Sequence, residues 1–283
     1  MRKLLFPLLL LASFILWRHA LAGTLSLALE NEAYTHILLI LPVSCALIYV
    51  KRSAAARFEP CMAAGISVLA AAILITAGAK YAASLPGDIR LSLSMLALVT
   101  WWIGSVILCF GTQAFRSFLF PLCFLFLLVP LPMIVVNSMV EFLQRESALS
   151  ARILFRLIGV PVTQDGVVLS IPGLDIEVAQ ECSSIRSSLM LVVTTMILAQ
   201  LFLRSWWRQI LLVAAAIPLS IAKNGLRIVV IGELGTRVDP GYLTGGFHHH
   251  GGVVFLSLGI AAIVALLLLF RRTELPPARS NFV

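Results

Sequence analysis

Apolar residues fall into long runs along this chain, and short polar stretches separate them. A membrane-spanning helix needs about 20 mostly apolar residues. Eight runs have roughly this length: residues 4–22, 33–50, 60–79, 91–110, 117–136, 184–203, 209–231 and 252–270. The first run follows a basic start and resembles a signal peptide, but its length and the further runs favour an uncleaved helix. The pattern predicts an all-α polytopic membrane protein with about eight transmembrane helices.

The longest interval between two runs, residues 137–183, has a different pattern. Its first part, SMVEFLQRESALSARILFRLIG, places apolar residues at helical spacing with Glu and Arg between them. This predicts an amphipathic helix on or near the membrane surface. Two alternating runs, VVLSI and LDIEV, then flank Pro172-Gly173. A Pro-Gly pair between such runs indicates a turn, so we expect a small β-hairpin insertion.

Composition supports a membrane protein and excludes other classes. The chain is 60% hydrophobic and 12% charged, with a mean hydropathy of +1.01, whereas soluble domains carry about 25% charged residues. The net charge of +8 comes without basic tracts or basic residues interleaved with aromatic ones, so we expect no nucleic-acid partner. Eleven of the 21 basic residues lie in one alternate set of short loops and tails, with two of the 13 acids. The positive-inside rule makes this set and both termini cytoplasmic.

Three polar clusters interrupt the apolar pattern, and this topology puts all three at the outer face. They read ECSSIR at 181–186, KNGLR at 223–227 and GGFHHHGG at 245–252. Three helices could bring these ends into one outer pocket. Ionisable residues within an apolar span are unfavourable and indicate a function by default, which applies above all to Arg227.

Cys182 is the cysteine that the apolar pattern leaves unexplained. None of the five cysteines forms a CxxC pair, and four fit as small apolar residues in helices: Cys45, Cys61, Cys109 and Cys123. A thiol becomes a good nucleophile as a thiolate, which a helix N-terminus or a nearby cation favours. Cys182 precedes a predicted helix and has Arg186 four residues on. With a histidine to carry a proton and an arginine to stabilise an oxyanion, the clusters are suited to acyl transfer.

Each cluster also has a simpler interpretation. A cysteine at a helix start is commonly inert, and arginines at membrane edges commonly extend to the interface. The histidine run could bind a metal or have no function. Two further protein classes therefore stay open. One is a transporter or channel lined by Lys223, Arg227 and the histidines, although the chain has no internal repeat; the other is a non-catalytic scaffold for polysaccharide export.

The three clusters together resemble the exosortase/archaeosortase family of multipass membrane cysteine transpeptidases. That family has a Cys-Ser-Gly-apolar-Arg motif, an Asn-x-apolar-Arg motif and a His followed by three residues and a glycine. Here these read CSSIR at 182–186, NGLR at 224–227 and HHHGG at 248–252. Three positions depart from the family pattern without removing a reacting group: Ser184 for glycine, Gln180 for an acid and Val253 for an aromatic residue.

The resemblance covers about residues 117–270, which we expect to be the catalytic region of a single integral membrane domain, 1–283. Residues 1–116 would form an N-terminal four-helix region and residues 271–283 a cytoplasmic tail.

The resemblance implies a role for each motif residue. Cys182 would attack a peptide carbonyl and hold an acyl-thioester, and Arg227 would stabilise the tetrahedral intermediate. His248 would be the third catalytic residue, because it alone of the three histidines has a glycine four residues on. Four residues would have supporting or fallback roles: Arg186, Asn224, His249 and His250. The resemblance implies no cofactor and no metal.

Substrates of such enzymes are exported, membrane-anchored proteins with a C-terminal tail made of a short motif, a helix and a basic cluster. The resemblance places cleavage at the extracytoplasmic face of the bacterial inner membrane, in contact with membrane lipids. The acyl group would pass to an envelope component, and polysaccharide-export machinery is a further expected partner.

Overall fold

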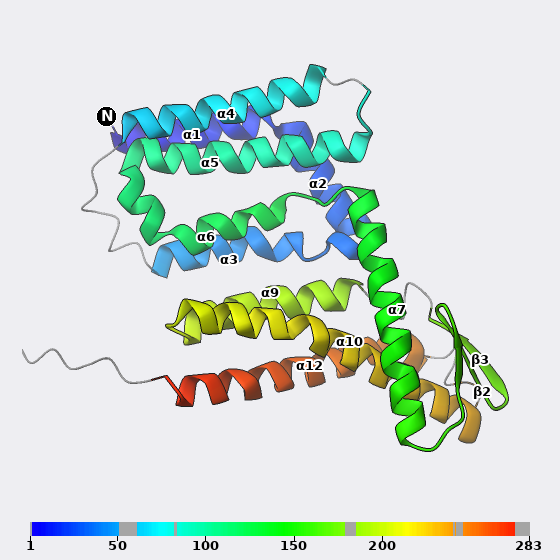
Figure 1. The fold of residues 1–283 in the computed structure, drawn as a ribbon. Coiled ribbons are helices and arrows are strands. Elements are labelled where there is room, and N and C mark those ends of the chain that lie inside the picture. The colour runs from blue at the N-terminus through cyan, green and yellow to red at the C-terminus, as the bar shows by residue number, and fades with distance from the viewer. Residues whose placement is uncertain are drawn as a thin grey trace, which may run out of the picture. The chain divides into compact units, whose positions relative to one another are not determined.

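The computed structural model describes residues 2–50, 61–81, 84–178, 185–239, 241 and 246–274 (Figure 1). The chain divides into two compact units, Met1–Val136 and Asn137–Val283. The boundary lies within a single helix, α7 (Met133–Leu157).

Unit 1 is helical. Its elements before α7 are α1 (Arg2–Leu16), α2 (Arg18–Glu30), the 3-10 helix η1 (Glu32–Tyr34), α3 (Ile37–Val50), α4 (Met62–Tyr81), α5 (Gly87–Ser117), α6 (Leu119–Phe124) and the 3-10 helix η3 (Leu125–Leu128). α4 and α5 run side by side (Figure 1). A Cβ on Gly65 would lie 2.5 Å from the Cα of Leu108, and one on Gly104 would lie 3.0 Å from the Leu69 side chain. Small residues of this kind let membrane helices approach closely.

Two of the expected spans are bent pairs rather than continuous helices. Residues 4–22 fall on α1 and α2, which meet at 70°. Residues 117–136 fall on two helical segments. The first is Leu119–Leu128, made of α6 and η3, and the second is the start of α7; the two are bent by 96°. Pro130 and Pro132 stand at the second bend, where proline removes a backbone donor and disfavours helix in the residue before it.

Polar side chains of unit 1 hold the second bend. Ser92 Oγ donates to the carbonyl of Pro130 at 2.6 Å, and the buried Tyr34 hydroxyl donates to the carbonyl of Leu131 at 2.8 Å. The backbone N–H of Met133 donates to Asp88 Oδ2 at 2.9 Å, which satisfies one of the orphan donors at the start of α7.

Six helices of the described residues are long and apolar enough to cross a membrane, or up to eight if each bent pair is one span. The other six expected spans each correspond to one of these helices. The all-α polytopic fold class is confirmed.

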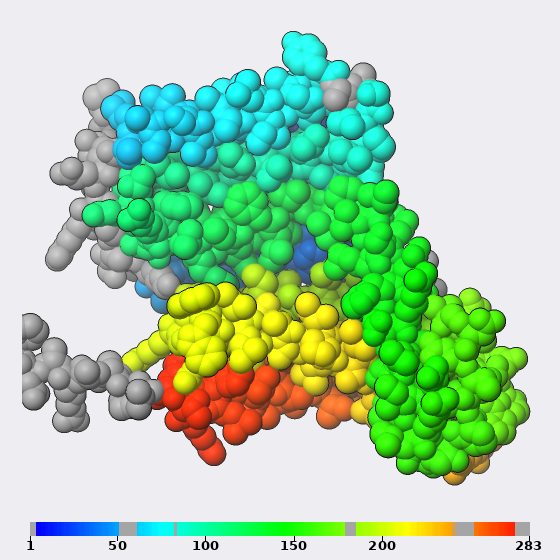
Figure 2. Space-filling view, viewed as in Figure 1, coloured from blue at the N-terminus to red at the C-terminus, as the bar shows by residue number. Residues whose placement is uncertain are grey.

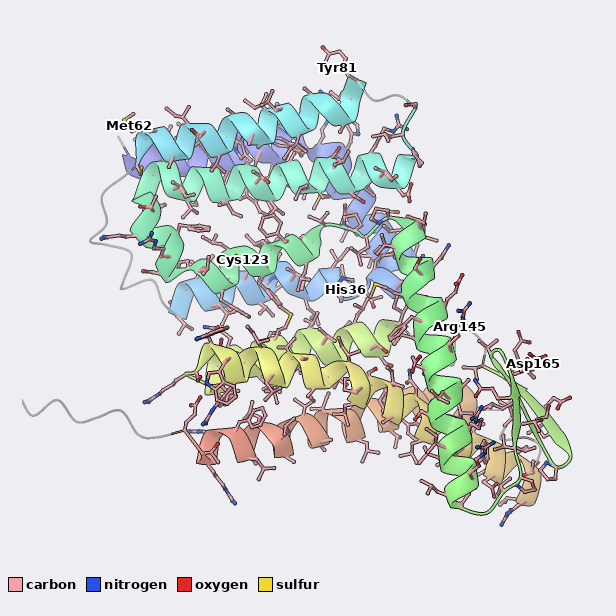
Figure 3. All side chains as sticks on the ribbon, viewed as in Figure 1. His36, Met62, Tyr81, Cys123, Arg145 and Asp165 are labelled. Carbon is pink, nitrogen blue, oxygen red and sulfur yellow. The ribbon has the colours of Figure 1, made fainter. Side chains whose placement is uncertain are left out.

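Unit 2 combines a helix bundle with a small sheet. Its elements after α7 are β1 (Thr163–Asp165), β2 (Val168–Ile171), β3 (Leu174–Glu177), α9 (Ile185–Phe202), α10 (Trp206–Arg237) and α12 (Gly246–Arg272). α9, α10 and α12 run side by side (Figure 1), and their side chains fill the space between them (Figure 3). One buried cluster takes a residue from each helix: Leu191, Ala216 and Ile263.

The sheet is antiparallel, in the order β1-β2-β3. The expected hairpin is β2–β3, in which Ile171 pairs with Leu174 and Gly173 adopts a φ of 85° in the turn. That prediction is confirmed. β1 is an additional strand, which pairs Asp165 with Val168 across a turn at Gly166, φ 58°. The Asp-Gly pair is a hairpin signal, but the run before it, TQD, lacks the alternation by which strands are recognised.

The expected amphipathic helix is α7, which begins at Met133, before the predicted residue 138. Its buried face packs against the sheet and α10, whereas Arg145 and Glu141 are largely exposed. One buried cluster joins the three: Ala148, Ala151 and Phe155 of α7, Leu169 and Ile171 of β2, and Ile228 and Val229 of α10. The space-filling view shows α7 lying directly against the sheet segment (Figure 2). This cluster fixes the sheet onto the end of α10.

Candidate functional site

α10 holds three buried polar side chains, from the second of the predicted clusters. Lys223, Asn224 and Arg227 are 5%, 1% and 7% exposed. Lys223 and Arg227 are four residues apart, so they lie one turn from each other on one face of the helix. Two basic side chains buried in an apolar helix are unfavourable and indicate a function.

The length of α10 places Arg227 near one end of a membrane-sized stretch. Arg227 follows Trp206 by 21 residues, which is about 32 Å along an α-helix. A bilayer core is about 30 Å thick. The last part of α10, from Ile228, therefore extends beyond that thickness, where it packs on α7 and the sheet.

Hydrogen bonds join the first turn of α9 to the middle of α10. Lys223 Nζ donates to Ser187 Oγ at 2.6 Å. Ser220 Oγ donates to Ser188 Oγ at 2.7 Å. Ser188 and Ser220 are both buried, so these bonds lie inside the bundle. They fix the start of α9 beside the polar cluster of α10.

α12 and α7 contact the same stretch of α10 through glycines. A Cβ on Gly259 of α12 would lie 3.4 Å from Lys223 Cδ, which is ordinary van der Waals contact. A Cβ on Gly225 would lie 2.7 Å from Ser150 Cβ and 3.0 Å from the backbone nitrogen of Ala151, and would also overlap Ser150 Oγ. Glycine at 225 is therefore needed for α7 to cross α10 this closely.

The chain that leads toward residue 182 leaves the sheet at a fixed point. Val178 is 1% exposed and belongs to the same buried cluster as Ile228 and Val229, which come directly after Arg227. Gln144 Nε2 of α7 donates to the carbonyl of Val178 at 2.9 Å, and the N–H of Val178 donates to the carbonyl of Val167.

Cys182 lies outside the described residues, as do its neighbours at 179–184. Arg186 is exposed in the first turn of α9. The other four cysteines carry no disulfide: Cys45 and Cys123 are exposed, Cys61 is half-buried and Cys109 is buried. Cys61 directly precedes α4 instead of lying within a helix, which corrects its prediction, whereas Cys123 on α6 is labelled in Figure 3.

The three histidines lie within α12, of which the structure describes the backbone at these positions. The predicted helix began at residue 252, after the histidines, and this boundary is wrong, because α12 begins at Gly246, six residues earlier. His248 stands eleven residues before Gly259, about three helical turns, and so shares its face. His250 stands half a turn from His248, on the opposite face. The Gly259 face is the one that meets Lys223 and Leu191.

The sequence model of the transmembrane exosortase family matches residues 17–268 of the chain. The chain belongs to the transmembrane exosortase family. The match starts well before residue 117, where the resemblance in motifs began, so the exosortase pattern includes most of unit 1. No curated protein and no solved structure matches the chain.

Exosortase membership supports a membrane-embedded sorting transpeptidase that acts on exported proteins. The geometry of unit 2 is consistent with this chemistry, since the buried Lys223 lies where α9, α10 and α12 meet and the buried Arg227 follows it by one turn of α10. Among the residues that the structure describes, no three His, Cys, Asp or Glu side chains are grouped so that they could hold a metal ion. This statement does not include His248, His249 and His250, because the structure does not describe their side chains.

Three residues of the candidate site were given no part in the acyl-transfer chemistry predicted from the sequence: Lys223, which was considered only as part of a transporter path, Gln144 and Gly225. Lys223 stood out as a cation in an apolar span, but Ser187, its partner, is 36 residues away. Gln144 looked like one polar residue of an amphipathic helix, and its partner Val178 is 34 residues away. Gly225 looked like one more glycine of the Asn-x-apolar-Arg motif.

Proposed function

We propose that this exosortase is a cysteine transpeptidase that removes the C-terminal tail of exported proteins. The Cys182 thiolate attacks the carbonyl carbon of the scissile peptide bond. The C–N bond breaks as the tail's amine takes a proton from a histidine, which leaves the acyl group on sulfur. An amine of an envelope acceptor then attacks the thioester, gives its proton to the histidine, and releases the thiolate.

The observation that carries the proposal is that both ends of the connection around Cys182 are tied to the stretch of α10 that holds Arg227. Val178 packs with Ile228 and Val229 at one end. At the other end, α9 is bonded to Ser220 and Lys223. In the sequence, three residues separate Cys182 from Ile185 at the start of α9, and three residues of extended chain reach at most about 11 Å.

The heights of α9 and α10 along their axes also support the proposal that Cys182 acts together with Arg227. Ser188 and Ser220 are bonded and so lie at one level. From Ser188 back to its first residue, Ile185, α9 extends three residues, about 4.5 Å. From Ser220 to Arg227, α10 extends seven residues in the same direction, about 10 Å. The chain enters α9 from that side, so the residues between Cys182 and Ile185 are long enough to bring the thiol to the level of the guanidinium.

Arg227 is suited to stabilising charge and unsuited to donating a proton. A guanidinium stays protonated at any physiological pH and offers several N–H donors in a fixed geometry. Held in a buried site, these donors would stabilise the oxyanion of the tetrahedral intermediate. Arg186 and Asn224 are proposed as supporting residues.

His248 is the proposed proton carrier. It precedes Gly252 by four residues, as the family motif requires, and it shares a helix face with Gly259, which meets α9 and α10. His249 and His250 are the fallback choices, and His250 falls on the opposite face.

The proposed substrate is a membrane-anchored exported protein that ends in a motif, a helix and a basic cluster. Its helix would lie in the lipid beside the enzyme, and its basic cluster would stay in the cytoplasm with both termini of the enzyme. The active site then faces the extracytoplasmic side of the bacterial inner membrane. Polysaccharide-export machinery is proposed as the source of the acceptor.

The test compares wild type with Cys182→Ala on a tagged substrate from the same genome, chosen because wild type shortens it on a gel. Cys123→Ala is the matched control, since Cys123 is an exposed cysteine on α6. We expect tail removal in wild type and Cys123→Ala and none in Cys182→Ala. Equal processing by Cys182→Ala would refute the thioester mechanism and favour a transporter or scaffold.

A further inference from the structure

Lys223 is the most deeply buried basic side chain that the motif chemistry leaves without a role. It is 5% exposed in a helix whose neighbours are mostly apolar. A charged side chain at such a position is strongly unfavourable, and apolar residues of similar volume commonly stabilise a protein when they replace a buried ion. A lysine at 223 therefore reduces stability unless another property requires it.

The contacts of Lys223 lead to α9 and α12. Its Nζ donates to Ser187 Oγ at 2.6 Å, in the first turn of α9. Its stem passes Gly259 of α12, where a Cβ would lie 3.4 Å from Cδ, beside the Leu191 side chain of α9. Both neighbouring helices thus hold the stem, and the ammonium is directed to the start of α9.

Among the described residues, no charge beside Lys223 neutralises it. The nearest charged side chain on its own helix is Arg227, one turn away, and like charges at this spacing are unfavourable. On α9 the side chains that meet it are those of Ser187 and Leu191, and on α12 it meets Gly259. Within the described part of unit 2, every acidic side chain is at least partly exposed, and no ion pair includes Lys223.

We propose that Lys223 is a positioning residue for the transpeptidase reaction. Through Ser187 it fixes the first turn of α9, and its charge favours anionic states at that end of the helix, where the proposed thiolate and oxyanion form. A fixed charge in a buried site acts strongly on neighbouring groups because little solvent screens it. This inference rests on the proposed function.

Four variants separate charge, hydrogen bond and packing. Lys223→Met keeps the volume and removes both charge and bond; Lys223→Gln keeps a donor without the charge; Lys223→Arg keeps both. Ser187→Ala removes the bond and leaves the charge. Lys80→Met, the same change at an exposed position of α4, is the matched control.

The readouts are the initial rate of tail removal and the Tm of the purified protein in detergent. We expect Lys223→Met to keep or raise Tm and to lower the rate by roughly tenfold or more, as loss of a preorganised charge does. Lys223→Arg should retain most of the rate, Lys223→Gln should lose it like Met, and Ser187→Ala should lower it with Tm unchanged. Lys80→Met should match wild type.

Two results would overturn the inference. One is a wild-type rate in Lys223→Met, or in Ser187→Ala if the Met variant does not fold. The other is a fall in Tm with activity lost only in proportion to the folded fraction, which indicates a structural lysine. Cys182→Ala is measured in parallel: if it processes substrate, the proposed function fails, whereas an inactive Cys182→Ala with a fully active Lys223→Met refutes this inference alone.

Discussion

Gly225 provides the sharpest test of the packing that surrounds the site. An alanine Cβ at this position would overlap Ser150 Oγ and would lie 2.7 Å from Ser150 Cβ and 3.0 Å from the Ala151 nitrogen. Because one of these atoms belongs to the backbone of α7, a side-chain rotation cannot relieve the contact. Gly225→Ala should therefore push α7 and α10 apart.

The magnitude follows from a comparison with a second glycine. Gly259→Ala meets only ordinary contacts, at 3.4 Å and beyond. Both changes gain about 1 kcal/mol from the higher helix propensity of alanine, so this gain cancels in the difference between them. What remains is the overpacking at 225, about 1–3 kcal/mol. At about 2–4 °C per kcal/mol for a chain of this size, Gly225→Ala should unfold several degrees below Gly259→Ala.

Thermal unfolding of the purified variants in one detergent measures this difference. Ser150→Gly removes both side-chain atoms that the new Cβ would meet and leaves the 3.0 Å contact with the Ala151 nitrogen. Because the new glycine itself costs helix stability, the double variant is compared with Ser150→Gly alone. Against that reference Gly225→Ala should cost less than it does in wild type, and the loss in tail-removal rate should shrink with it. If Gly225→Ala is as stable as Gly259→Ala, or if Ser150→Gly does not reduce the cost of Gly225→Ala, the close crossing of α7 and α10 is not the reason for glycine at 225.

Two further predictions concern the approach to the site. His248→Ala should abolish tail removal while His250→Ala retains most of it, because the two positions face opposite sides of α12; a gel assay decides, and the reverse order would exclude His248 as proton carrier. Gln144→Met should lower the processing rate with little change in Tm, because it removes the hydrogen bond that holds the Val178 carbonyl. The control is Gln164→Met, which removes an exposed hydrogen bond to the carbonyl of Gly166 in the same turn. Equal rates in the two variants would contradict an anchoring role for Gln144.

Hydropathy predicted the fold class because the bilayer sets the length of each apolar run. It did not predict the bends at Trp17 and after η3, since an apolar run reads the same whether its helix is straight or bent. At the second bend Pro130 and Pro132 gave a local signal. At the first bend, Trp17 gives no such local signal.

Candidate site residues could be picked out from the sequence where their signal is local to one motif. Asn224 and Arg227 could be singled out because a polar group within an apolar run is visible from its neighbours in sequence. The proposed role of Lys223 depends on its bond to Ser187, and the anchoring of Val178 depends on its bond to Gln144. Neither pairing leaves a trace in the local sequence pattern. The position of the histidines within α12 was missed because the glycines around them are typical of loops.

The length of α10 is sufficient for one helix to span a bilayer and still carry a charged group past its apolar part. Its first 21 residues match the thickness of the hydrocarbon core, and its serine and lysine contacts fix that part against α9. In the part that follows, Ile228 and Val229 pack against α7 and the sheet. Arg227 lies at the junction of the two parts. Because both parts are anchored to other elements, Arg227 cannot shift along the helix axis without breaking one set of contacts, and this gives the guanidinium a fixed height relative to the chain that enters α9.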